Sequence, residues 1–147
     1  MSTVVNLYDT YRKNRLNPAS SAVSGTLKVA LVTSAYTPNQ NTHEFFSDVS
    51  GQVSGSNYTA GGNVLASVTC TMDAAGLVTL DAADPSPFLQ HASGFSNARR
   101  AVLYFDTGTA GTSRLMAYSA DFGADIGNVA LDLTLSLNAA GIYTGAR

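Results

Sequence analysis

The stretch NVLASVTCTMDAAGLVTLD, residues 63–81, decides the fold. Apolar and polar side chains alternate along Asn63–Met72, and a second, shorter run of strand-forming residues follows at Leu77–Asp81. Alternation with a period of two residues is the mark of a β-strand with one face toward a core. The segment Asp73–Gly76 lies between the runs, and its Asp and Gly are common turn residues. The stretch therefore predicts an antiparallel hairpin closed by residues 73–76.

The same kind of pattern recurs along most of the chain. Further strands are expected at Thr26–Thr33, Arg99–Phe105, Arg114–Phe122, Val129–Leu137 and Ile142–Thr144. The alternation is clearest in Val129–Leu137, where Val129, Leu131, Leu133, Leu135 and Leu137 are expected to point inward. Turn-forming residues at 106–113 and 138–141 connect neighbouring runs. About seven short strands with Gly- and Asn-rich turns are typical of an antiparallel β-sandwich or jelly-roll-like domain.

The first residues have a different period. Apolar and aromatic side chains at Val4, Leu7, Tyr8 and Tyr11 recur at spacings of three and four, which predicts an α-helix over Thr3–Leu16. Pro18 ends it, because the residue before a proline is pushed out of the helical region. We therefore expect a mainly β protein preceded by a short N-terminal α-helix. Residues 1–25 hold the helix and its connection, and residues 26–147 form a single β-sandwich domain.

The region 34–62 interrupts the run of strands as an inserted loop region. Residues 36–39 are expected to form a turn, Thr42–Asp48 a short helix capped by Thr42, and residues 53–62 a loop with room for an edge strand. Long insertions in small β domains often carry partner contacts. Phe45 and Phe46 need separate burial sites, so either both lie in the domain or one of them faces a partner. The candidate partner interface comprises Tyr8, Tyr11, Arg12, Tyr36, His43, Phe45, Phe46 and Tyr58.

Composition excludes several classes of protein. Charged residues make up 12% of the chain and the net charge is −2, so no basic field for nucleic acid is expected. Apolar residues reach 45%, which argues against disorder. No apolar run is long enough to span a membrane, and residues 1–16 do not have the pattern of a signal peptide. Cys70 is the single cysteine, and we expect it to be a small buried hydrophobic residue sharing a face with Val68 and Met72.

Chemistry-bearing motifs are weak. The two histidines, His43 and His91, lack the partners of a zinc motif. The acidic pairs in Asp81–Asp84 and Asp121–Asp125 offer oxygens for calcium, but turn residues bonded to nearby backbone are the stronger alternative. No G-x-S-x-G motif or phosphate-binding loop occurs. We expect no enzyme activity, no cofactor and no metal.

Four blocks, in order along residues 5–144, carry a family resemblance. They are Thr26–Asp48 (TLKVALVTSAYTPNQNTHEFFSD), Asn57–Gly62 (NYTAGG), Arg99–Thr109 (RRAVLYFDTGT) and Asp121–Asp125 (DFGAD). The chain resembles a family of small virion structural proteins of tailed phages and prophages. It departs from that pattern at the doubled arginine Arg99–Arg100, and at Ser86–His91, where the family's segment is expected to carry Trp.

The resemblance implies a non-enzymatic structural role in a phage particle. The leading expectation is a capsid decoration (cement) protein that binds the major capsid lattice and stabilises the head. The alternative is a low-copy neck, tail or fibre component, in contact with another virion subunit or the host receptor. In either case the protein is expected to be made in the host cytoplasm and assembled into the virion. Virion modules follow the symmetry of their platform, so a homo-oligomer, with a trimer as the first guess, is expected.

Overall fold

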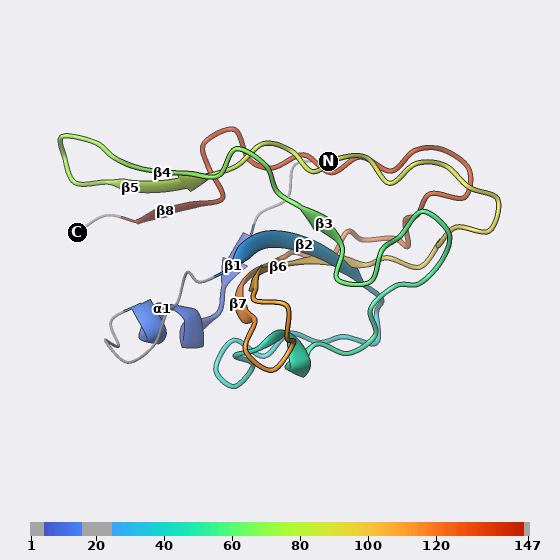
Figure 1. The fold of residues 1–147 in the computed structure, drawn as a ribbon, viewed down its shortest axis with the longest axis horizontal. Helices are drawn as coiled ribbons and strands as arrows, with labels where there is room; N and C mark the ends of the chain where they lie inside the picture. The colour runs from blue at the N-terminus through green and yellow to red at the C-terminus, as the bar shows by residue number, and fades with distance from the viewer. Residues whose placement is uncertain (1–4, 16–24, 146–147) are drawn as a thin grey trace.

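The computed structural model describes residues 5–15 and 25–145. These residues form two antiparallel sheets and a short helix near the N-terminus (Figure 1). The elements are β1 (Val5–Leu7), α1 (Asp9–Arg15), β2 (Thr26–Val32), the 3₁₀-helix η1 (Phe46–Asp48), β3 (Asn63–Val64), β4 (Thr69–Met72), β5 (Val78–Asp81), β6 (Arg100–Asp106), β7 (Arg114–Ser119) and β8 (Tyr143–Gly145). The fold is mainly β and sandwich-like, as the sequence predicts.

A five-stranded sheet, in the order β1-β7-β6-β2-β3, forms the middle of the molecule. Strand β2 pairs along its whole length with β6, from Thr26 opposite Asp106 to Val32 opposite Arg100. Consecutive residues of β6 are buried, because both faces of this sheet are covered. In Figure 1, α1 and the first part of the 34–62 loop lie below the sheet, and β4, β5 and β8 lie above it.

The second sheet, in the order β4-β5-β8, has two chemically different faces. The register places Cys70 opposite Leu80 and Leu80 opposite Tyr143, so apolar side chains share one face. Threonines share the other face, where Thr71 lies opposite Thr79 and Thr79 opposite Thr144. Such short strands need a packed apolar face to be stable, and this one is turned toward the large sheet.

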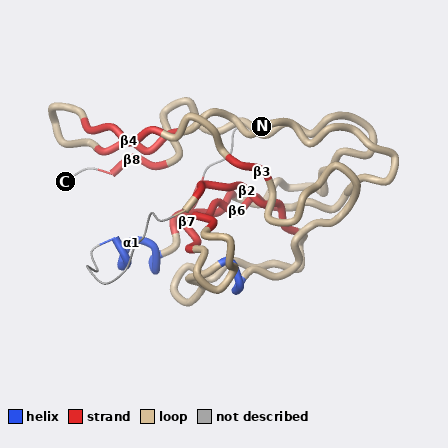
Figure 2. Tube along the Cα trace, viewed as in Figure 1, coloured by secondary structure: helices blue, strands red, loops and turns tan. Residues whose placement is uncertain are grey.

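Irregular extended chain continues the upper layer beyond the small sheet (Figure 2). Residues 83–98 and 124–137 run beside each other there, joined by isolated bridges between Phe88 and Leu133 and between Ala98 and Ile126. Phe88 and Phe95 point into the core, and their rings lie 5.8 Å apart, edge to face. The core therefore extends well beyond the regular strands.

Several predicted elements are confirmed. Strands β2, β5, β6 and β8 lie within one residue of the predicted runs, and β7 begins at the predicted Arg114 but ends three residues early, at Ser119. The predicted hairpins β4–β5 and β6–β7 form, and the turn of the first is closed by a hydrogen bond from the Gly76 N–H to the Asp73 carbonyl oxygen at 3.0 Å. No helix among the described residues has the length and apolar character needed to cross a bilayer.

The predicted helix over Thr3–Leu16 is wrong in its first half. Residues 5–7 instead form β1, an edge strand paired with β7, and the Tyr8 N–H still donates to the Met116 carbonyl oxygen at 3.1 Å. The helix begins only at Asp9 and ends at Arg15 within the described residues. Tertiary pairing to an available sheet edge outweighs the local helical pattern. Residues 1–4 and 16–24 of the prediction lie outside the described residues.

Two predicted strands are also wrong. Asn63–Met72 is not continuous, because Ser67 takes a φ of 52°, a left-handed conformation that breaks a strand. The chain leaves the large sheet after β3 and enters the small sheet at β4, and Cys70 is exposed rather than buried. Val129–Leu137 contains no regular strand, and Val129 and Leu131 are exposed while Leu135 is buried. In the 34–62 loop the helical turn is only Phe46–Asp48, and the Asp48 carboxylate, not Thr42, accepts the N–H groups of Glu44 and Phe45.

Candidate partner-binding surface

Three tyrosines of the predicted interface lie in the core. Tyr8, Tyr11 and Tyr36 have exposed fractions of 0, 5 and 2%. Pairing of β1 with β7 draws Tyr8 under the large sheet, and Tyr11 stacks on Phe105 with 6.2 Å between ring centroids. Because these rings are buried within the chain, they are not available to a partner.

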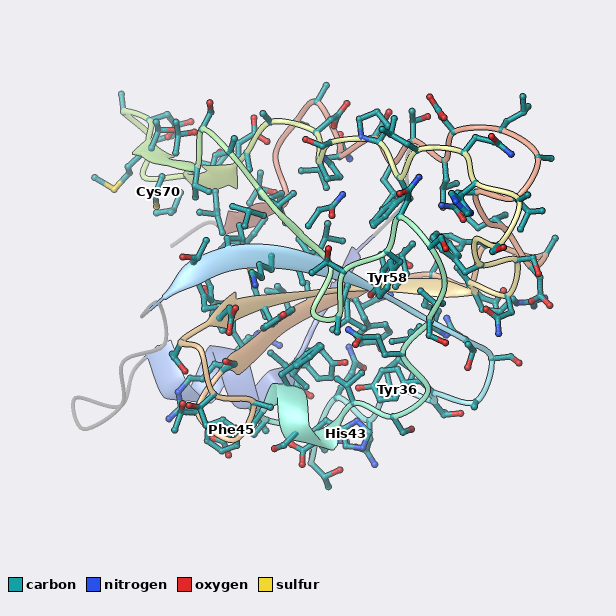
Figure 3. All side chains as sticks on the ribbon, turned by 45° about the vertical axis from the view of Figure 1, so that its right-hand side comes forward. Tyr36, His43, Phe45, Tyr58 and Cys70 are labelled. Atoms are coloured by element: carbon teal, nitrogen blue, oxygen red, sulfur yellow. The ribbon has the colours of Figure 1, made fainter. Side chains whose placement is uncertain are left out.

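Tyr8, Tyr36 and His43 form a hydrogen-bonded chain that joins the N-terminal segment to the 34–62 loop. The hydroxyls of Tyr8 and Tyr36 are 2.7 Å apart. The Tyr36 hydroxyl is 2.9 Å from His43 Nδ1, and Figure 3 shows these two side chains close together. The Asn39 N–H also points at Nδ1, at 3.3 Å, so Nδ1 is the acceptor. Tyr36 therefore donates to His43, and Tyr8 donates to Tyr36. Burial raises the pKa of both tyrosines, which keeps both hydroxyls protonated.

Tyr36→Phe tests this chain of hydrogen bonds. The variant leaves the buried Tyr8 hydroxyl without its partner, so we expect the free energy of unfolding to fall by about 1–3 kcal/mol. Tyr118→Phe is the control, because the Tyr118 hydroxyl has no hydrogen bond within the described part of the chain and its loss should change stability little. The double variant Tyr8→Phe, Tyr36→Phe should lose less than the sum of its single changes, since both partners are removed together. Urea unfolding followed by circular dichroism measures the stability of the double variant and of the single variants Tyr8→Phe, Tyr36→Phe and Tyr118→Phe. If Tyr36→Phe were as stable as the wild type, the assigned chain of hydrogen bonds would be contradicted.

The other predicted aromatic residues are half-buried and have partners within the domain. The Arg114 guanidinium lies 4.9 Å from the centroid of the Phe45 ring, and Phe46 stacks on Tyr104 at 4.0 Å. Tyr58 packs against the core and its hydroxyl accepts a hydrogen bond from the Leu31 N–H at 3.0 Å. Burial raises its pKa to about 12. Arg12 is exposed and pairs with Asp9, at 3.4 Å. The contacts of Phe45, Phe46 and Tyr58 hold the 34–62 loop onto the sheet.

A groove of about 480 Å³ opens between the two sheets at one end of the sandwich. Its walls are the apolar face of the small sheet and the adjoining end of the large sheet. The lining residues are Tyr11, Gly25, Thr26, Leu27, Leu65, Val68, Cys70, Val78, Leu80, Phe105 and Tyr143. This set contains no charged side chain, so the groove offers apolar contact and little acid–base chemistry.

The acidic residues considered for calcium have other partners. Asp121 pairs with Arg99 at 2.9 Å and with Arg100 at 3.5 Å, and its pKa is lowered first by the Gly123 N–H and then by these arginines. Asp84 accepts the Leu137 N–H at 2.6 Å. No cluster of potential metal-ligating side chains is present in residues 5–15 and 25–145. These carboxylates bond to backbone or arginine instead of gathering around a cation.

The surface that sequence reasoning missed is an apolar patch on the upper layer. Leu89, Val129 and Leu131 are 57, 38 and 76% exposed, and we call them the outer patch. They come from the two extended segments that run side by side at 83–98 and 124–137. Single exposed leucines are common on protein surfaces, but neighbouring ones on the same layer are typical of contact sites.

Hydrogen bonds hold the outer patch in place. The side chain of Gln90 donates to the Val129 carbonyl oxygen at 2.7 Å, and the Gln90 N–H donates to the Asp132 carboxylate at 2.6 Å. Beneath them lies Asn128, which is fully buried and donates to the Leu89 carbonyl oxygen at 2.8 Å. A patch that is already ordered loses little conformational entropy when a partner binds.

Alternation in the sequence could not reveal this patch. It shows that side chains point in turn to two sides, but it does not show which side lies under a second layer. Val129 and Leu131 were expected inward for that reason. Comparison of the chain with known protein families, with curated proteins and with solved structures finds no match.

Proposed function

We propose that this protein is a non-enzymatic structural protein of a tailed-phage virion, and that it decorates the capsid by binding the major capsid protein. The outer patch is the observation that carries the proposal, because it offers a fixed apolar contact surface. The family resemblance of the sequence supports the virion setting. The low content of charged residues, 12% of the chain, supports a role in contact with other subunits, because the centres of interfaces are depleted in charge.

The outer patch fits a protein partner better than it fits a small ligand. It is formed by separate exposed side chains on paired extended segments and not by the groove, which lies beside the small sheet. Interface centres are apolar and depleted in charge. The Asp132 carboxylate beside the patch accepts the Gln90 N–H. The three patch side chains carry no charge, so a partner can cover them without burying one if the exposed Asp132 carboxylate stays in contact with water.

Leu131→Lys tests the contact surface. Capsids purified without the protein are mixed with wild-type or variant protein, and the bound fraction is measured by sedimentation. Placing an ammonium group at the centre of an apolar contact should weaken binding about tenfold or more. Folding should be unaffected, because Leu131 is 76% exposed.

Thr37→Lys is the matched control, because it adds the same charge at an exposed position of the 34–62 loop. We expect it to bind like the wild type. The opposite result, in which Thr37→Lys binds capsids weakly and Leu131→Lys binds normally, would show that the 34–62 loop is the contact surface, as first expected from the sequence. If the wild type does not bind capsids at all, capsid decoration is wrong.

Copy number in purified virions decides between decoration and the alternative role. A simple ratio to the major capsid protein supports decoration, and removal should then lower the temperature at which particles burst, because binding only to the assembled shell stabilises it. A few copies per particle would assign the protein to the neck, tail or fibres.

A further inference from the structure

The strand β4 is an open edge of the small sheet, and its side chains are exposed. All of its side chains, Thr69–Met72, are exposed, and Met72 is 69% exposed. It pairs with β5 on one side, and within the described part of the chain no strand lies on its other side. Figure 1 shows the β4–β5 hairpin reaching out from the body of the molecule.

The hydrogen-bonding pattern shows which backbone groups of β4 point outward. The Asp73 N–H donates to the Leu77 carbonyl oxygen at 3.0 Å, so Asp73 faces β5. Backbone groups alternate in direction along a strand, and Thr71 therefore also faces β5. The N–H and C=O groups of Cys70 and Met72 point to the open side. These groups can be satisfied by the backbone of another strand.

Nothing in β4 protects this edge. Exposed edges are usually guarded by lysine, proline or a bulge. The sequence TCTM has no charge and no proline, and its register with β5 is unbroken. The edge β3 in the large sheet has only the residues Asn63–Val64, and β8 ends in Gly145. Of these edges, β4 is the best template for strand addition.

We infer that β4 pairs with β4 of a second copy of this chain, antiparallel and about a two-fold axis. Cys70 then lies opposite Met72 of the partner subunit, and Thr71 lies opposite Thr71 of the partner subunit. Every outward N–H and C=O group of Cys70 and Met72 gains a partner in this register. The apolar face continues onto the apolar face and the threonine face onto the threonine face.

Other registers are worse. A shift by one residue would place threonines on the apolar face. A shift by two would set Cys70 opposite itself and Met72 opposite Val68, which lies before the strand. Self-pairing is favoured because the strand is neutral, so no like charges face each other. A two-fold contact of this kind closes on itself and gives a dimer. This inference does not depend on a role in a virion, because it concerns the purified protein alone.

A cysteine placed at the axis tests the register. Residues opposite each other in a non-hydrogen-bonded pair have Cα atoms about 4.5 Å apart, which a disulfide can span. The variant Cys70→Ser, Thr71→Cys should form a covalent dimer on mild oxidation, seen on a non-reducing gel. The control is Cys70→Ser, Thr144→Cys, with the thiol on the same face but at the β8 edge. It should remain uncrosslinked, and a crosslinked control with an uncrosslinked Thr71→Cys variant would overturn the inference.

The oligomeric state in solution provides a second, independent measurement. Light scattering coupled to size exclusion should give a dimer for the wild type and a monomer for Met72→Lys at the same concentration. Leu131→Lys adds the same charge away from β4 and should remain a dimer. Unfolding curves for both variants show whether the monomer is still folded. A wild-type monomer, or the trimer first expected for a virion module, would contradict two-fold pairing through β4.

Discussion

Gly62→Ala is expected to prevent the domain from folding stably, with a loss of more than about 4 kcal/mol in the free energy of unfolding. Gly62 is buried, and its φ of 76° lies in the left-handed region, which alanine adopts only with strain. A Cβ atom there would overlap the Val29 carbonyl oxygen and crowd Ala30 Cα in the central strand β2. Backbone atoms cannot move aside as a flexible side chain can, so the strand pairing itself would have to shift.

Gly108→Ala separates the two causes. Gly108 has a similar φ of 87°, but no atom lies within 4 Å of the position that a Cβ would take. This variant should lose only about 1 kcal/mol, the cost of the backbone conformation alone. Urea unfolding of both proteins measures the difference. Equal losses in the two variants would show that the close approach of residue 62 to β2 is not as described.

Asn128→Ala is expected to lower the free energy of unfolding by about 3 kcal/mol or more. The buried Asn128 side chain accepts the Phe95 N–H at 2.9 Å and donates to the carbonyl oxygens of Leu89 and Ser56 at 2.8 and 3.1 Å. Its removal leaves the Phe95 N–H and the Ser56 carbonyl oxygen without this partner, and a buried group without a partner costs about 1–3 kcal/mol. The Leu89 carbonyl oxygen keeps a longer hydrogen bond from the Asn57 side chain, at 3.3 Å. The backbone of Gly94 lies directly against the Asn128 amide, which leaves little room for a different side chain at position 128.

The Asn128 variant should also lose the local order of the outer patch. Hydrogen exchange should accelerate at residues 88–95 and 126–133 more than in β2 and β6, because the missing side chain ties those segments together. Asn97→Ala, at an exposed position on the same layer, is the control and should change neither stability nor exchange. If exchange rises uniformly through the domain, Asn128 stabilises the fold without specifically ordering the patch.

The β6–β7 part of the large sheet could be predicted from the sequence because it is a local hairpin. The runs on both sides of residues 106–113 pair with each other, and the turn residues between them are apparent. The run Thr26–Val32 is apolar on both faces, which correctly indicates a central strand. In these places short-range pattern and long-range packing agree, and the predictions hold.

The predictions fail where contacts between residues far apart in the sequence determine the local structure. The helical pattern before Asp9 is overruled because β7 offers an edge to Val5–Leu7. The alternation in Val129–Leu137 is real, but the segment is held by Asn128, Gln90 and Asp84 side chains and not by a continuous ladder. The break in Asn63–Met72 lies at Ser67, which has a left-handed conformation. A glycine at this position would have indicated the break in the sequence, but a serine does not. As a result, the aromatic residues chosen as a contact surface are largely buried or half-buried, and the outer patch was expected inside.

The pairing of β2 with β6 has a consequence for how the chain acquires its structure. Residues 26 and 106 are neighbours in the sheet, so the central pair of strands cannot form until most of the polypeptide has been synthesised. The β4–β5 hairpin joins residues close in sequence and can form much earlier. The long loop between β2 and β6 must close before the packing of the two strands stabilises it, and this slows folding. A nascent chain should therefore expose the unprotected β4 edge before its large sheet has formed. Premature strand pairing and aggregation are then most frequent when synthesis is slow or when many ribosomes are close together.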